Sequence, residues 1–175
     1  MPDRVTVKRL ALLVVGFLVA GAAGGVLWER LSEPTKGLTY EGQWYLEPAG
    51  PDVGFQAIAL FVLIAFPLGL VLSVLAGLWR SGETATVVTV LVAATAAGIL
   101  MYVVGAGLGP ADPQALAAGS PDYTPLPGNL GLTAPDAGRT AWHSTALLAF
   151  PAGAMTGLVG MFLFGSQGLP RPPRG

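Results

Sequence analysis

Residues 53–78 read VGFQAIALFVLIAFPLGLVLSVLAGL, and this stretch decides the fold. It holds sixteen Leu, Ile, Val or Phe residues and no charge. A helix rises about 1.5 Å per residue and the hydrocarbon core of a bilayer is about 30 Å thick, so about 20 apolar residues cross it. Each of these large apolar side chains favours insertion by roughly 0.3 to 0.6 kcal/mol. The stretch therefore predicts a transmembrane helix.

Three more stretches without charge are long enough to span a bilayer, namely residues 10–28, 84–111 and 140–170. The whole chain is 53% hydrophobic and 11% charged, whereas about a quarter of a soluble domain is charged. Backbone in lipid must satisfy its own hydrogen bonds, and one continuous apolar segment per crossing favours helices over barrel strands. We predict an all-α integral membrane protein. Its single domain is a four-transmembrane-helix bundle, with spans at about 10–28, 53–79, 84–108 and 140–164.

Two longer loops and one short turn connect these spans. The turn at 80–83 has four residues, which predicts that the second and third helices form an adjacent antiparallel hairpin. The loop at 29–52 contains the aromatic and β-branched stretch 39–46, which predicts a short β-hairpin or a strand lying on the membrane. The loop at 109–139 is rich in Pro and Gly, so we expect it to be extended and irregular apart from a helical turn at 112–118.

The distribution of charge predicts an orientation. Six of the nine Lys and Arg residues lie on the side of the N-terminus, namely Arg4, Lys8, Arg9, Arg80, Arg171 and Arg174. The positive-inside rule then places both termini, the turn and the tail 165–175 in the cytoplasm. The two faces carry net charges of +4 and −5, which add up to the total of −1. Both longer loops are therefore expected to be extracytoplasmic, in a cytoplasmic membrane.

The first span has an alternative interpretation as a cleaved signal peptide. Basic residues precede its apolar run, and residues 20–22 (Ala-Gly-Ala) resemble a cleavage site. We favour an anchor, because the apolar run continues through Val26 and Leu27 to a full-span length.

Small residues recur at four-residue spacing in the predicted helices. The rows are Gly16, Ala20 and Gly24; Gly21 and Gly25; Gly69, Ser73 and Gly77; Gly105 and Gly109; and Gly153 and Gly157. As helix-packing residues we single out Gly21, Gly25, Gly69, Ser73, Gly77, Gly153 and Gly157. This spacing lets membrane helices approach closely. We favour packing within one subunit and leave a homodimer open. Trp28, Trp79 and Trp142 lie near helix ends and predict anchors at the membrane interface.

One candidate polar cluster is expected at the outer face. Glu29 ends the first span, and Arg139 and His143 lie at the start of the fourth, so all three share one membrane depth. A structural hydrogen bond or a solvated pair is the alternative interpretation. A single His without clustered carboxylates is a poor metal site, and we expect no metal and no cofactor.

Several function classes are excluded or disfavoured by what the chain lacks. It has no Cys, which removes disulfides, thiolate metal sites and thiol redox chemistry. No charged residue lies deep in a span, although proton-coupled and ion-coupled carriers usually place one there. One His cannot supply two axial haem ligands, and no phosphate-binding Gly motif is present.

The chain resembles an uncharacterised family of small actinobacterial membrane proteins. The resemblance rests on AAGGVLWE at 22–29, GLVLSVLAG at 69–77 followed by Arg80, and GAGLGPADP at 105–113. It implies four helices and a Gram-positive cytoplasmic membrane, and it carries no site residues.

We therefore expect a non-enzymatic accessory or cell-envelope component that acts through its extracytoplasmic loops. Its expected partners are the lipid bilayer and another membrane or envelope protein, with no nucleic acid. One alternative is a carrier or channel for a small molecule or lipid, in which kinks at Pro67 and Pro151, each near mid-span, open a path. Its lining residues are Thr86, Thr89, Thr95, Tyr102, Thr145 and Thr156. A second alternative is a membrane enzyme using Glu29, Arg139 and His143, if these three meet beside a cleft.

Overall fold

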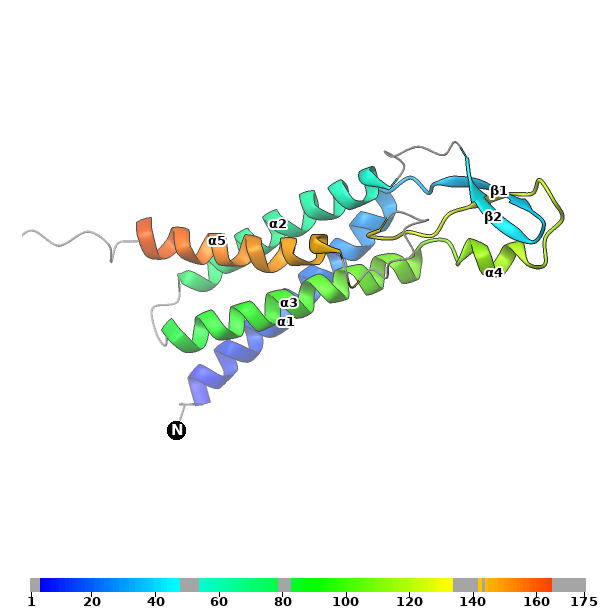
Figure 1. Ribbon diagram of the computed structural model, residues 1–175. Helices are drawn as coiled ribbons and strands as arrows, with labels where there is room; N and C mark the ends of the chain where they lie inside the picture. Colours follow the sequence, from blue (N-terminus) through cyan, green and yellow to red (C-terminus); the bar gives the residue numbers. More distant parts are fainter. Residues whose placement is uncertain (1–3, 48–53, 79–82, 134–141, 143, 165–175) are drawn as a thin grey trace, which may run out of the picture.

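A computed structural model describes residues 4–47, 54–78, 83–133, 142 and 144–164 (Figure 1). The main helices are α1 (Arg4–Leu31), α2 (Phe55–Gly77), α3 (Glu83–Leu108) and α5 (Ala149–Phe164), the last preceded by the short 3-10 helix η2 (Thr145–Leu148). Four helical segments are long and apolar enough to cross a membrane: Val7–Leu31, Phe55–Gly77, Thr84–Ala117 and Thr145–Phe164. The prediction of four spanning helices in a membrane protein is confirmed to that extent.

The four helices form two closely packed parallel pairs. α1 packs along α3, where Gly21 faces Ala97 and Gly25 faces Met101. α2 packs along α5, where Gly69 faces Phe150 and Ser73 faces Gly157. Residue numbers rise together in both pairs, so the helices of each pair run in the same direction.

The prediction that the second and third helices are adjacent is wrong, although the two helices run antiparallel as predicted (Figure 1). α2 and α3 share far less contact than either shares with its parallel partner, and smaller contacts of α1 with α2 and of α3 with α5 close the bundle. α2 and α3 therefore lie diagonally across it. A short turn brings only the ends of two helices together, whereas rows of small residues decide which faces meet along their length.

The predicted position of Pro151 near the middle of its helix is also wrong. α5 begins at Ala149, after η2, so Pro151 lies in the first turn of the helix. Backbone N–H groups in a first turn have no partner within the helix, and a missing donor costs little there. Ser144 stabilises the entry to η2, because its Oγ accepts a hydrogen bond from Ala146 N at 3.3 Å.

The connecting segments at one end of the bundle form a small sheet, so the protein is not purely α-helical. Strands β1 (Lys36–Tyr40), β2 (Gln43–Leu46) and β3 (Pro125–Pro127) form an antiparallel sheet in the order β2-β1-β3. The short helix α4 (Pro113–Ala117) packs beside it. We call residues 33–47 and 109–133 together the sheet subdomain. The hairpin and the helical turn near 112–118 are confirmed.

β3 corrects the prediction that the second loop is irregular apart from its helical turn. Pro125 and Pro127 lie opposite Leu38 and Lys36, in a strand at the edge of the sheet. Proline lacks a backbone donor, and edge strands are where a sheet tolerates it. The hairpin itself turns at Glu41 and Gly42, whose φ angles of 49° and 73° are those of a two-residue type I′ turn.

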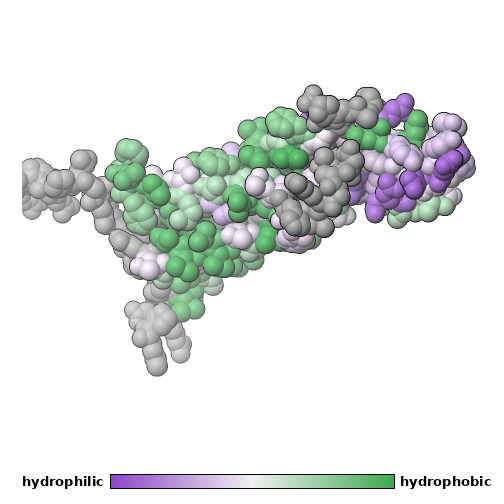
Figure 2. Space-filling model, in the orientation of Figure 1, coloured by the Kyte–Doolittle hydropathy of each residue, from purple (hydrophilic) through white to green (hydrophobic). Residues whose placement is uncertain are grey.

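Apolar and polar surfaces divide between the two parts. Apolar side chains cover the bundle, whereas hydrophilic ones gather on the sheet subdomain (Figure 2).

The prediction that Trp28 is an anchor at the membrane interface is wrong, because this side chain is fully buried. Its Nε1 donates to Ala57 O of α2 at 2.8 Å, and its ring meets Phe61 edge-on at 5.1 Å. Trp142 is 61% exposed, as an interface anchor would be, and Trp79 lies outside the described residues.

Candidate functional site on the sheet subdomain

Thr39 joins the two connecting segments into one unit. It is fully buried, and its Oγ1 donates to Pro121 O at 2.6 Å and accepts from Thr124 N at 3.0 Å. Its backbone accepts from Tyr123 N at 2.7 Å and donates to Thr124 O at 3.1 Å. These bonds bridge more than 80 residues of sequence. The two loops therefore fold together and not separately.

Gln114 of α4 saturates the free edge of β2. Its Oε1 accepts from Trp44 N at 3.2 Å and its Nε2 donates to Trp44 O at 3.0 Å, so the side-chain amide takes the place of a neighbouring strand. Trp44 Nε1 donates to Leu126 O of β3 at 3.1 Å. An unpaired edge invites pairing with another chain, and this arrangement closes part of it.

The two faces of the sheet are unlike. Side chains alternate along a strand, so Gly37, Thr39 and Trp44 lie on the buried face, beside α4. Leu38, Tyr40 and Tyr45 lie on the opposite face, where Tyr40 is 44% exposed and Tyr45 is 51% exposed. The described residues place no helix or strand over that face.

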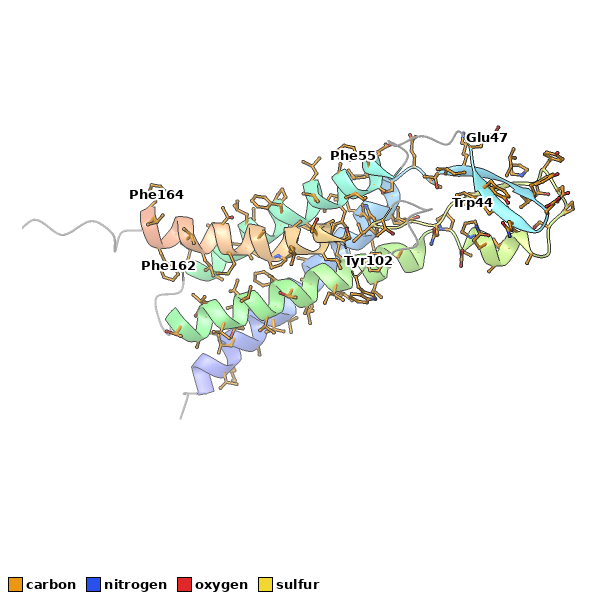
Figure 3. The ribbon with its side chains drawn as sticks, viewed as in Figure 1. Trp44, Glu47, Phe55, Tyr102, Phe162 and Phe164 are labelled. Carbon is orange, nitrogen blue, oxygen red and sulfur yellow. The ribbon has the colours of Figure 1, made fainter. Side chains whose placement is uncertain are left out.

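A groove of about 350 Å³ runs over the uncovered face. Seven residues line it: Leu38, Thr39, Tyr40, Tyr45, Leu46, Glu47 and Tyr123. Trp44 and Glu47 mark the position of β2, at the end of the molecule farthest from Phe162 and Phe164 (Figure 3). We call this groove and its three tyrosines the tyrosine face.

Tyr123 has an uncommon backbone conformation. Its φ of 62° lies in the left-handed region, where a residue with a side chain costs roughly 1–2 kcal/mol. Its ring is 70% exposed and lies 5.8 Å from the ring of Tyr40. Because the ring is exposed, burial does not explain an aromatic residue here. Glycine or asparagine would adopt this backbone conformation at lower cost. Backbone strain retained at an exposed residue is a reason to propose a functional role for Tyr123.

The sheet subdomain carries a strong excess of negative charge. Its described residues include five carboxylates, Glu33, Glu41, Glu47, Asp112 and Asp122, against the single cation Lys36. Asp112 caps α4 by accepting from Gln114 N, and Asp122 Oδ1 accepts from Glu41 N at 2.9 Å. Glu47 borders the tyrosine face itself. The surface therefore favours a cationic ligand.

The sequence-predicted polar cluster is described only in part. Glu29 is half-buried at the end of α1 and lines a pocket of about 200 Å³ with Arg30, Ser32 and Gly109 among others. Arg139 and His143 lie outside the described residues. Within the described ranges, no group of three or more His, Asp or Glu side chains is placed to hold a metal ion.

All seven small residues singled out from the sequence lie at contacts between helices of this chain. A Cβ atom would clash with backbone at Gly21, Gly25, Gly69, Gly153 and Gly157, and would crowd the side chain of Met161 at Gly77. Ser73 is fully buried and donates to Leu70 O of its own helix at 2.9 Å. These faces are therefore occupied by contacts within the subunit.

Two of the residues proposed to line a transport path, Thr95 and Thr145, line one groove of about 340 Å³ together with Trp142. Thr95 and Thr156 are exposed on the bundle, and each donates to a carbonyl one turn earlier in its own helix. Thr86 is buried, Thr89 is half-buried, and the ring of Tyr102 packs between Trp28 and Trp142. Thr145 also lines a second apolar groove of about 340 Å³, beside η2.

Sequence reasoning missed the residues that build the tyrosine face. Thr39, Tyr40 and Tyr45 fall within the predicted hairpin, but Tyr123 lies in a Pro-rich segment with no periodicity. A tyrosine in the sequence does not predict a positive φ angle. The Asp122–Tyr123 pair among turn-forming prolines was the available hint of a tight turn.

Comparison with known proteins gives no further guide, because no protein-family model, curated protein or solved structure matches the chain.

Proposed function

We propose that this protein is a non-enzymatic accessory or cell-envelope component that recognises a partner through its sheet subdomain. The observation that carries the proposal is the tyrosine face, an aromatic surface that no described helix or strand covers, on a unit built from both connecting segments. Large exposed aromatic patches on soluble subdomains commonly mark interaction sites. The four helices then serve as an anchor that holds this unit at the membrane.

The proposed orientation places the sheet subdomain outside a cytoplasmic membrane and both termini in the cytoplasm. It rests on the excess of Lys and Arg on the side of the N-terminus and of carboxylates on the side of the sheet. The resemblance to small actinobacterial membrane proteins favours a Gram-positive cytoplasmic membrane. The partner is then a protein of the cell envelope, encountered at the outer surface.

A carrier function has less support. Thr95 and Thr156 satisfy their hydroxyls within their own helices while they lie exposed on the bundle. The contact between α2 and α5 is closed by Gly69, Gly153 and Gly157. A path along these helices would therefore require the close contacts to open.

Site-specific photo-cross-linking in native membranes tests the proposal. A photoreactive residue replaces Tyr123 on the tyrosine face, and matched probes replace Leu116 of α4 and Val92 of α3, which are exposed elsewhere. We expect one discrete cross-linked protein with the Tyr123 probe and none with the controls. Equal cross-linking from all three positions, or catalytic turnover by the purified chain alone, would contradict the proposal.

A further inference from the structure

We propose that the tyrosine face binds an extended, basic, proline-containing segment of a partner polypeptide. This inference rests on the proposed function and names the ligand class of the same site. The groove combines three tyrosine rings with a carboxylate at its border, inside a strongly acidic subdomain.

The shape of the groove suits an extended chain. It follows β1 from the level of Glu47 towards Tyr40, next to the hairpin turn. β1 has five residues, which at about 3.4 Å each gives a length of about 17 Å. A polyproline II helix rises about 3.1 Å per residue, so about five residues of such a segment fill the groove. A compact ligand would leave part of it empty.

The side chains suit proline and arginine together. Grooves lined by aromatic rings bind proline-rich segments, whose preformed conformation loses little entropy on binding. The Tyr40 and Tyr123 rings are tilted by 54° at 5.8 Å, and Tyr45 OH donates to Gln43 Oε1 at 3.0 Å, which holds the third ring. A guanidinium group stacks on such rings and pairs with a carboxylate. Glu47 supplies that carboxylate.

Charge and distance argue against other occupants. A second copy of the same acidic face would meet like charge. The basic tail of this chain, residues 165–175, follows Phe164 at the opposite end of the bundle (Figure 3). Its eleven residues reach at most about 40 Å. The fourth span is itself about 30 Å long, so a tail that ran back along it would use most of its reach before the sheet. A neutral saccharide would stack on the rings and donate hydroxyl hydrogen bonds to Glu47, but it would gain nothing from the net negative charge of the subdomain.

Binding is measured with the full chain in nanodiscs of phosphatidylcholine. The probe is a fluorescent peptide of Arg-Pro-Pro repeats, compared with Ser-Pro-Pro repeats, which lack charge, and Arg-Gly-Gly repeats, which lack proline. We expect the Arg-Pro-Pro peptide to bind at least about tenfold more tightly than either control, and its affinity to fall as salt rises.

Variants of the face locate the binding. Tyr123→Asn and Tyr45→Ala should each weaken Arg-Pro-Pro binding about tenfold, because aromatic anchors dominate such interfaces. Glu47→Gln should weaken it about threefold and reduce its salt dependence. Leu116→Ala on α4, outside the groove, should leave it unchanged. The Tyr123→Asn variant relieves backbone strain, so loss of binding there does not report unfolding.

Three results would overturn the inference. They are equal binding of the Arg-Gly-Gly peptide, affinity that is unchanged in the tyrosine variants, and binding of a neutral chitin oligosaccharide that depends on Tyr45 and Tyr123 while the peptides fail to bind. If the Tyr123 photo-probe still captures a partner in membranes, the proposed function stands and only the ligand class is wrong.

Discussion

The helix bundle and the sheet subdomain are held together by different interactions. In the bundle, hydroxyls such as those of Ser73, Thr95 and Thr156 bond to their own helices, and the helices meet through small residues. In the sheet subdomain, Thr39 and Trp44 form hydrogen bonds to residues 70 or more positions away. Close packing therefore fixes the anchor, whereas directional bonds fix the surface that we propose acts in recognition.

Filling a helix contact should have the largest effect. Gly157→Leu would drive a side chain into Ser73 Oγ and the backbone of Leu70, at the contact of α2 with α5. Because interiors tolerate overpacking poorly, we expect a loss of about 3 kcal/mol in the free energy of unfolding. Unfolding of the purified protein in mixed detergent micelles measures it.

Gly160→Leu on the same helix is the matched control, since nothing lies within 4 Å of a Cβ atom there. It should be neutral or slightly stabilising, because Leu favours a helix more than Gly does. Equal destabilisation by both variants would mean that α2 and α5 do not meet at Gly157.

Removing the buried hydroxyl of Thr39 should have an intermediate effect, confined to the sheet subdomain. Thr39→Val keeps the shape but leaves Pro121 O and Thr124 N each with one hydrogen bond fewer, at a cost of about 2 kcal/mol. Hydrogen exchange should accelerate at the amides of Tyr123 and Thr124, while α3 keeps its protection. Thr95→Val, which removes an exposed hydroxyl on the bundle, should change neither region. Unchanged exchange at both amides in Thr39→Val would show that the hydroxyl does not join the loops.

Replacing Tyr123 should have the smallest effect on stability and the opposite sign. Asparagine adopts a positive φ more readily than tyrosine, so Tyr123→Asn should raise the free energy of unfolding of the sheet subdomain by about 0.5 to 1 kcal/mol. Tyr45→Ala, at a residue with ordinary strand geometry, should bring no such gain. A loss of stability in Tyr123→Asn would mean that the ring supports the fold, and the argument for retained strain would fail.

The sequence predicted the bundle because hydropathy is a local property. Each span shows as a stretch without charge, whatever it packs against. Which helices pair is not local, so the four-residue turn suggested α2 with α3, although the faces of Gly69 and Gly153 decide otherwise. The prediction of an interface anchor at Trp28 failed for a related reason. A tryptophan near a helix end is typical of an interface anchor and of a buried hydrogen-bond donor alike.

The candidate site was less predictable, because its parts come from two loops. The hairpin could be inferred from residues 39–46 and α4 from residues 112–118. β3 has only three residues, two of them proline, and its pairing with β1 depends on Thr39 reaching Pro121 and Thr124. The predicted cluster of Glu29, Arg139 and His143 stays a prediction, since two of its members lie outside the described residues.

A cross-link between β1 and β3 tests most directly that the two loops form one sheet. The chain has no cysteine, so any disulfide within an engineered variant must come from the two introduced cysteines. Leu38 and Pro125 are opposite each other in the register, at a Cα separation of about 4.5 to 5.5 Å, which suits a disulfide. In membranes, Leu38→Cys with Pro125→Cys should oxidise almost completely, and Leu38→Cys with Leu116→Cys, from opposite sides of the sheet, should not. Failure of the first pair, or equal oxidation of both, would contradict a joined sheet and the tyrosine face built on it.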